Sequence, residues 1–176
     1  MSLKEMMSPF ARPVSADQGE HLFTQGEASR ELFIIEEGLL KAYYISHDGQ
    51  ERIKSFLLPG DVIGSLAALK GDDGSSFNLV CLQPSKLQVV SFDDVYKAAR
   101  DDAKLSAAIV EFLVAYGMKK EQREFELLCL SAEDRYRRLV NSRPELLNMV
   151  YQSDIALYLG VTPVGLSRIR KRVEAA

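Results

Sequence analysis

Short apolar runs, separated by turn residues, fill the first half of the chain. Glycines recur between these runs, and Asp48-Gly49 stands between two of them, where this dipeptide favours a hairpin turn. The last two runs, separated by Gln83-Pro84-Ser85, are expected to form a second strand pair. The spacing predicts an all-β unit but does not choose between a barrel and a sandwich. The predicted strands are residues 21–23, 32–35, 39–45, 52–58, 78–82 and 86–92.

The pattern changes to a helical period after Ser91. Residues 92–96 predict a short helical turn, and residues 102–129, which contain no proline, predict one long helix. One apolar stripe along this helix consists of Leu105, Ile109, Phe112 and Tyr116, and a second, at its far end, consists of Leu127, Leu128 and Leu130. Ser131, followed by acidic residues, is an expected N-cap that begins a helix over residues 132–142.

Two short helices joined by a tight turn are predicted near the end of the chain. Ile155 and Leu159 are four residues apart, and Gly160 follows them at the place where a left-handed C-cap is favoured. Thr162 and Pro163 then supply an N-cap and the first residue of a new helix. The length of this break is typical of a helix-turn-helix unit.

The second of these helices, expected over residues 163–172, has an apolar side and a cationic side. On a helical wheel Leu166, Ile169 and Val173 lie within about 60° of one another. The opposite side offers a hydroxyl and cations, which match the acceptors of a DNA major groove. An ordinary helical hairpin with a solvated charged face is the alternative. We predict DNA contacts at Thr162, Val164, Ser167, Arg168, Arg170, Lys171 and Arg172.

Composition and charge agree with a folded protein that binds nucleic acid. The 176 residues are 47% hydrophobic, which is enough for one ordinary domain or two small ones. From Ser131 onward eight Lys/Arg stand against five Asp/Glu, a net charge of +3, whereas residues 1–130 carry 14 against 20, a net charge of −6. This asymmetry is a weak cue for nucleic acid. No apolar run long enough for a membrane and no secretory signal are present, so we expect a cytoplasmic location.

Cysteine and histidine give no indication of catalysis or metal binding. Cys81 and Cys129 lie in apolar segments and are expected to be buried structural residues. Two cysteines cannot hold an iron–sulfur cluster within one chain, and His21 and His47 are expected to be turn residues without partner ligands. The chain also lacks the common motifs that combine a nucleophile with its base. We therefore expect no catalytic residue, no metal site and no enzyme activity.

Motifs in both halves of the chain resemble the Crp/Fnr family of bacterial transcription regulators. Residues 154–169, DIALYLGVTPVGLSRI, are similar to the helix-turn-helix signature of that family. In the first half, the motifs around Gly19, Gly26, Gly38, Asp48-Gly49 and Pro59-Gly60-Asp61 occur in the order and spacing of the cyclic-nucleotide-binding β-roll. The resemblance runs from about residue 15 to residue 172.

The resemblance implies an α+β fold in three parts. Residues 1–101 would form an N-terminal double-stranded β-helix, also called a β-roll or jelly roll, and residues 102–130 a long dimerisation helix. Residues 131–176 would form a small all-α helix-turn-helix domain. Because the sequence stops at Ala176, we expect this domain to lack the full β-hairpin wing of many relatives, and we expect a correspondingly lower affinity for DNA.

The resemblance also implies a function: a sequence-specific regulator that binds a near-palindromic operator in double-stranded DNA. The partners it implies are a second copy of the chain, contacted through residues 102–130, and RNA polymerase, with no membrane. The alternative for this helix is that its apolar stripe packs only on the chain's own β-roll. Arg168 matches the family's guanine-reading arginine, whereas Val164 replaces a frequent glutamate, so the operator should differ from the usual half-sites. The alternative is a ligand-sensing or protein-interaction module with weak or lost DNA binding.

In relatives that bind cyclic AMP, a glutamate accepts a hydrogen bond from the ribose and an arginine neutralises the phosphate. Here Ser65 stands at the glutamate position, no arginine lies between Gly60 and Leu87, and Asp72 and Asp73 would repel a phosphate. We therefore do not expect cyclic AMP to bind in the usual way. No cofactor is established. Two possibilities are left open: the roll binds a different small effector, or it binds none. The pocket would be lined by Gly64, Ser65, Leu66, Ser75, Ser76 and Phe77.

Overall fold

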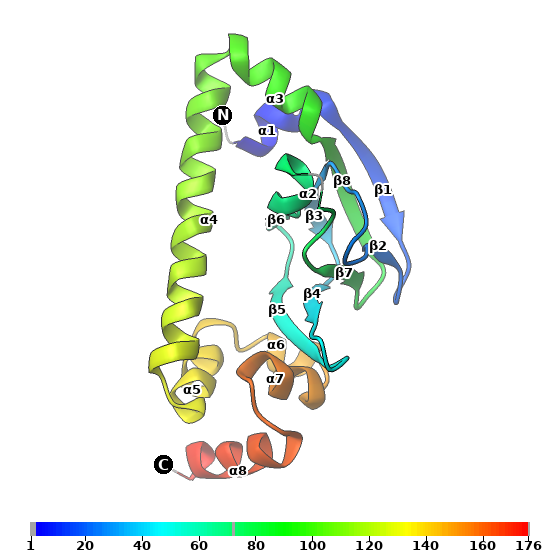
Figure 1. Cartoon of the computed structure of the whole chain (residues 1–176). Coiled ribbons are helices and arrows are strands. Elements are labelled where there is room, and N and C mark those ends of the chain that lie inside the picture. The colour runs from blue at the N-terminus through cyan, green and yellow to red at the C-terminus, as the bar shows by residue number, and fades with distance from the viewer. Residues whose placement is uncertain (1–2, 72, 176) are drawn as a thin grey trace.

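The computed structural model describes residues 3–71 and 73–175, and begins with two short helices and a β-roll (Figure 1). The roll contains the strands β1 (Ala11–Ala16), β2 (His21–Phe23), β3 (Glu31–Glu37), β4 (Leu40–Ile45), β5 (Glu51–Leu57), β6 (Val62–Ile63), β7 (Asn78–Cys81) and β8 (Ser85–Ser91). The helices are α1 (Leu3–Met7), the 3-10 helix η1 (Ser8–Phe10), α2 (Leu66–Lys70), α3 (Phe92–Asp101), α4 (Ala103–Cys129), α5 (Ala132–Ser142), α6 (Leu146–Met149), α7 (Gln152–Leu159) and α8 (Pro163–Glu174).

The described strands form two antiparallel sheets, in the orders β1-β8-β3-β6 and β2-β7-β4-β5. Between them lies an apolar core in which Phe23 packs against both Phe33 and Phe77, at ring-centroid distances of 5.8 and 5.2 Å. Burial of such rings is the main favourable term in folding. With the helices that follow, this arrangement confirms the predicted β-roll, long helix and all-α C-terminal part.

Two details of the strand prediction are wrong. β7 and β8 do not pair with each other, because the turn at Gln83-Pro84 carries the chain from one sheet to the other. β1 was not expected, since Pro13 interrupts it; the strand lies at a sheet edge, where the missing N–H of a proline is tolerated. The Asp48-Gly49 hairpin is confirmed between β4 and β5, with Gly49 at φ +76°.

The helical segment after the roll is longer than predicted at its start. Ser91 caps α3, a ten-residue helix instead of a short turn, and Asp102 caps α4 by accepting hydrogen bonds from the amides of Lys104 and Leu105. α4 is one continuous helix of 27 residues, as expected, and runs along the roll from α3 to α5 (Figure 1).

The two sides of α4 differ in what they contact. Leu105 is buried, Ile109 packs against the apolar cluster of α1, β3 and β8, and Tyr116 accepts a hydrogen bond from Lys54 of β5. The stripe singled out in the sequence therefore packs on the chain's own roll. A different apolar set faces solvent on the opposite side of α4, at Val110, Val114, Met118, Phe125 and Leu128, and Leu113 and Leu127 are exposed at its flanks.

The C-terminal helices share one apolar cluster with the roll. Tyr136, Leu139 and Leu146 pack in this cluster together with Ile155 and Leu159 of α7 and with side chains of β4, β5 and β7. The break expected near residue 131 coincides with the end of α4 and the N-cap of α5. The division of the chain into three domains stays a prediction. None of the described helices combines the length and the apolar character needed to cross a membrane.

Candidate nucleic-acid interface

The turn between α7 and α8 has the predicted geometry. Gly160 adopts the left-handed conformation, with φ +70° and ψ +33°, and Val161 N–H donates to Ala156 O at 2.9 Å. Thr162 Oγ1 accepts a hydrogen bond from the amide of Gly165 at 3.1 Å, and Pro163 occupies the first helical position. These local interactions set the position at which α8 begins.

Packing leaves one side of α8 free. Leu166 and Ile169 are buried in the shared apolar cluster, and the fully buried Ala156 gives room for the two helices to approach closely. On the other side Val164 is 62% exposed, and Ser167, Arg168 and Lys171 are exposed as well. The structure therefore presents a hydroxyl and cations together on one solvent-facing surface, as predicted from the wheel.

Ion pairs divide the cations of α8 into two groups. Arg172 Nε lies 2.8 Å from Glu133 Oε2 of α5, and Arg170 Nη2 lies 3.5 Å from Glu174 Oε1. The Arg172 guanidinium, and after it that of Arg137, lowers the pKa of the Glu133 carboxyl. Among the described residues, no ion pair is formed by Arg168 or Lys171. These two therefore carry the charges of α8 that no neighbouring carboxylate offsets.

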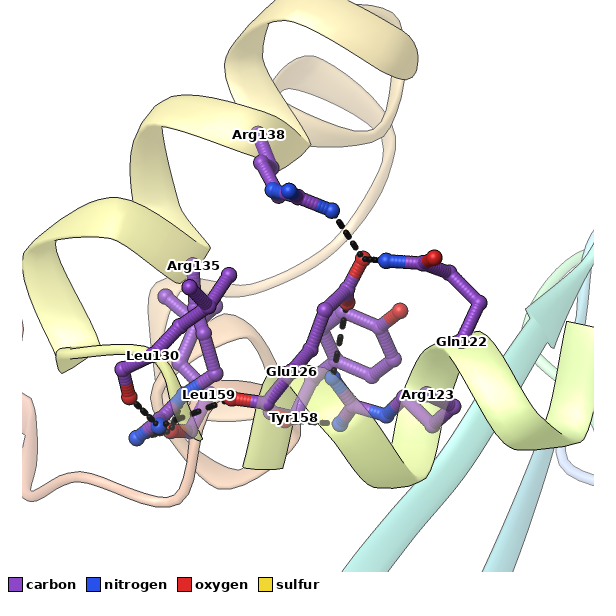
Figure 2. A network of polar contacts seen from close by, with 8 residues as sticks. All are labelled: Gln122, Arg123, Glu126, Leu130, Arg135, Arg138, Tyr158 and Leu159. Atoms are coloured by element: carbon purple, nitrogen blue, oxygen red, sulfur yellow. Dashed lines mark hydrogen bonds and ion pairs between the residues drawn. The ribbon is translucent and has the colours of Figure 1, made fainter. Parts of the chain in front are cut away.

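A polar network ties α7 to the end of α4 (Figure 2). Arg135 of α5 donates to Leu130 O at 2.6 Å and to Leu159 O at 3.0 and 3.2 Å. Arg123 of α4 donates to Tyr158 O, and its guanidinium carbon lies 3.9 Å from the centroid of the Tyr158 ring. Both arginines thus satisfy carbonyls near helix C-termini, where positive charge is favoured.

The sequence contained no signal for this network, because most of its acceptors are backbone carbonyls. Glu126 is the shared carboxylate: Arg138 and Gln122 donate to its Oε1 at 3.3 and 3.1 Å (Figure 2). Side-chain periodicity says nothing about which carbonyls a folded chain leaves without partners.

The roll holds α7 from the other side. Lys41 Nζ of β4 lies 3.5 Å from Asp154 Oδ1, and the rings of Phe56 and Tyr158 are 5.5 Å apart. Arg143, which follows α5, donates to Phe56 O at 3.2 Å. α7, on which α8 packs, is therefore positioned by α4, α5 and the β4–β5 hairpin together.

The predicted effector pocket is only partly assembled. Ser65, Ser75 and Phe77 are buried close together, and Ser65 Oγ accepts a hydrogen bond from the amide of Ser76 at 3.1 Å. Gly64 lies so close to β3 that a Cβ there would approach Leu32 Cδ2 to 2.8 Å. Leu66, by contrast, is 50% exposed, and Ser76 is exposed. Asp73 faces solvent, and Asp72 lies outside the described residues.

Lys54 covers this cluster and was not predicted as a site residue. Its Nζ lies 4.5 Å from the centroid of Phe77 and 3.2 Å from Tyr116 Oη. The strand pairing shifts between Ala42 and Tyr43, which leaves Lys54 as the extra residue of a β-bulge, and bulges commonly redirect a side chain. Burial, followed by the neighbouring Lys120 ammonium, lowers the pKa of Lys54 to about 7.

Replacing Lys54 by methionine should increase stability in a pH-dependent way. Because the pKa falls from 10.5 to about 7 on folding, the cost of burying the ammonium is complete below pH 7 and disappears as pH rises towards 10.5. Lys54→Met should therefore raise the melting temperature by a few degrees at pH 6, and by less at pH 9.5. Thermal melts across this range, with the exposed Lys104→Met as control, measure the difference. A gain that is the same at every pH would contradict the buried charge.

Cysteine and histidine positions correct two smaller expectations. Cys81 is buried, as expected, but Cys129 is exposed because it ends α4 on a side that nothing in the described chain covers. His21 lies in β2 and is hydrogen-bonded to Tyr43 Oη at 2.9 Å, whereas His47 occupies the β4–β5 turn as expected. No group of His, Cys, Asp or Glu in the described part of the chain could hold a metal ion.

Residues 13–102 match the cyclic nucleotide-binding domain, which is just over half of the chain. The chain belongs to the cyclic nucleotide-binding domain family. It is 27% identical to the anaerobic regulatory protein of Haemophilus influenzae, over 98% of this chain and 70% of that one. It is 26% identical to the fumarate and nitrate reduction regulatory protein of Vibrio cholerae, over 89% of this chain and 66% of the other.

Within this family, the relatives place the chain with regulators of the Crp/Fnr type, as the sequence motifs indicated. The chain spans about two thirds of the length of these curated relatives. Among solved structures, FixK2 from Bradyrhizobium japonicum superimposes with a TM-score of 0.78 at 19% identity, over 94% of this chain and 85% of that chain. That likeness establishes a shared fold. The relatives are named as regulators, in agreement with the expectation that the chain is not an enzyme.

Proposed function

We propose that this chain is a sequence-specific DNA-binding transcription regulator that acts in the cytoplasm. The observation that carries the proposal is the exposed side of α8, where Ser167, Arg168 and Lys171 face solvent directly after a helix-turn-helix turn. A helix presented in this way fits a major groove. The regulatory names of the relatives support the same conclusion, and they make RNA polymerase an additional partner in this proposal.

In this proposal the residues of α8 have different roles. Arg168 reads guanine, because its forked donors suit the O6 and N7 acceptors, and Ser167 contacts a neighbouring base. Val164 offers only a methyl surface, which suits thymine. Lys171 contacts phosphate, and so do Arg170 and Arg172 once their carboxylate partners exchange for the DNA backbone. The Thr162 hydroxyl oxygen accepts the capping hydrogen bond from the amide of Gly165, and its O–H can still donate to a phosphate.

The proposal includes a homodimer that forms through α4. The apolar residues that line the solvent side of α4, Val110, Val114, Met118, Phe125 and Leu128 among them, lie opposite the side that packs on the roll. A parallel pairing of two such helices would bury them. Two α8 helices would then reach successive major grooves of a near-palindromic operator, with half-sites about 34 Å apart.

The proposal also includes an effector other than cyclic AMP bound in the usual way. Support comes from the cluster expected to hold the nucleotide: Ser65 replaces the glutamate, and no described residue in the α2–β7 segment supplies an arginine. Ser75 and Phe77 are buried there, and the Lys54 ammonium already lies over the Phe77 ring.

Two substitutions in α8 test the DNA-reading role. Arg168→Ala should weaken binding to a selected operator by about 1–3 kcal/mol and relax specificity at one base position.

Lys171→Ala should weaken binding to every sequence alike and should flatten the dependence on salt, because it removes one phosphate contact. Titrations of labelled operator and random DNA at several salt concentrations measure both effects.

The control for these titrations is Lys104→Ala, which removes a cation from exposed α4 surface and should leave DNA binding unchanged. Equal losses on operator and random DNA for Arg168→Ala would refute base reading. If the purified protein selected no DNA sequence, the alternative of a ligand-sensing module without DNA binding would be favoured.

A further inference from the structure

A cavity of about 620 Å³ lies between β5, α4 and α5. Its wall includes Phe56 and Leu57 of the roll, Tyr116 of α4 and Leu139 of α5, and it reaches Tyr158 near the end of α7. This volume is within the range that holds a small organic ligand. The cavity lies beside the network of Figure 2, which contributes Arg123, Glu126 and Arg138 to its wall.

The charge of the lining is strongly one-sided. Asp61 and Glu126 are its only carboxylates among the described residues. The cations come from three separate parts of the chain, and they are Lys54, Lys119, Lys120, Arg123, Arg135, Arg138 and Arg143. The protein as a whole has a formal net charge of −3, so this concentration of positive charge does not reflect the overall composition.

Several of these cations have no carboxylate partner. Lys119 is paired with Asp61, and Arg138 is paired with Glu126. In the part of the chain that the structure describes, no ion pair includes Lys54, Lys120 or Arg143; Arg143 donates only to the backbone carbonyl of Phe56. Lys54 and Lys120 are neighbours of like charge, with Nζ atoms 5.7 and 4.9 Å from the centroid of the Tyr116 ring.

We propose that this cavity binds a small polyanion that carries phosphate or carboxylate groups. Lys120 of α4 and Arg138 and Arg143 around the end of α5 would hold the anionic groups, with Lys54 at the roll side. Arginine forks and lysine ammonium groups are the usual partners of such anions. The Tyr116 ring and Leu57 provide an apolar wall for the rest of the ligand.

The site is distinct from the predicted effector pocket and from the exposed side of α8, although it adjoins the former at Lys54. Ser65, Ser75, Phe77 and the exposed side of α8 are absent from its lining, and Lys54, which lies over the Phe77 ring, is the residue that it shares with the edge of that cluster. A ligand here would contact the roll, α4 and α5 together, which are the elements that position α7. Binding of the polyanion does not depend on DNA binding, so the two proposals can fail separately.

Proton uptake should accompany binding. The groups that face Lys54 are Lys120 and Tyr116 of α4, Tyr44 of β4 and the Phe77 ring, with Asp61 and Lys119 farther along the same cavity. No carboxylate in this set pairs with Lys54. An anion beside Lys54 favours its charged form, so binding should bring a proton with it near pH 7.5 and should weaken as pH rises to 9.

Calorimetric titration of the purified full chain tests the site, in phosphate-free buffers of constant ionic strength and different ionisation heats. The probes are inorganic pyrophosphate, citrate and ATP, with adenosine as the uncharged comparison. At least one polyanion should bind with a micromolar dissociation constant while adenosine does not bind, and pyrophosphate against citrate separates phosphate from carboxylate ligands. The double variant Lys120→Gln/Arg138→Gln should lose about tenfold or more in affinity.

The matched control is Lys104→Gln/Arg137→Gln, which removes one cation from each of the same two helices outside the cavity and should keep full affinity. If the first double variant fails to fold, Lys54→Met provides the same test and should also abolish proton uptake. The proposal would be overturned by absence of binding for every polyanion, or by equal losses in the cavity and control variants, which would mean non-specific attraction.

Discussion

A glutamate in place of Val114, on the solvent side of α4, should convert the proposed dimer into a monomer. Val114 is 55% exposed in the single chain and lies between Val110 and Met118 along the helix, with Phe125 on the same side about three turns farther on. In a pair of α4 helices this position would be central, and a buried carboxylate without a partner is strongly unfavourable. The variant should elute as a monomer in size exclusion with light scattering, at concentrations where the parent chain is a dimer.

The same substitution should also reduce affinity for the operator by about 100-fold or more. Each monomer would hold a single half-site, and the gain from linking two binding events would be lost. Ala115→Glu adds the same charge one residue along, outside the apolar stripe, and should leave both the oligomeric state and the operator affinity nearly unchanged. A Val114→Glu variant that stays dimeric would show that the dimer interface does not include this side of α4.

Replacing Arg135 by methionine should give the largest loss of stability among single changes in the C-terminal helices. The single guanidinium of Arg135 donates to Leu130 O, Leu159 O and Glu126 O, at distances from 2.6 to 3.4 Å. Methionine retains the aliphatic part of the side chain but removes the donor to Leu130 O and Leu159 O, whereas Glu126 O keeps the amide of Leu130, at 3.3 Å, as a donor. Loss of charged hydrogen bonds of this kind should lower the free energy of unfolding by about 2–4 kcal/mol.

Urea unfolding of both chains measures this difference, and Arg137→Met is the matched control. Arg137 lies two residues away on α5 and pairs only with Glu133, at 3.1 Å, on the surface. Surface ion pairs contribute little, so the control should cost less than about 1 kcal/mol. Similar losses in the two variants would contradict the structural role of the Arg135 carbonyl contacts.

Local signals in the sequence were sufficient for the turns and helix ends. Gly160 requires a positive φ, and Thr162 and Ser131 accept hydrogen bonds from amides three residues ahead, so each of these residues acts within its own segment. For the same reason the solvent-facing cations of α8 could be predicted from a wheel alone. Interactions between residues this close in sequence can be predicted from a short segment without knowledge of the rest of the fold.

Contacts between distant segments could not be predicted in this way. Both sides of α4 carry apolar residues, and periodicity does not say which side meets the roll; Tyr116 does so through Lys54, which is far away in sequence. The cationic cavity likewise arises because β5, α4 and α5 converge, whereas the sequence drew attention to a missing arginine after Gly60. Arg172 was expected to contact DNA. In the structure of the chain without DNA it forms an ion pair with Glu133, which lies on a different helix.

The apolar cluster that Phe56, Val80 and Leu139 share with Ile155 and Leu159 makes the recognition helices and the β-roll a single cooperative unit. Neither part can open without exposing apolar side chains of the other. A recognition helix transplanted onto another β-roll would therefore lose its packing surface along with its position. A substitution in this shared cluster that destabilises the β-roll should therefore also alter the position of α8, the helix proposed to contact DNA.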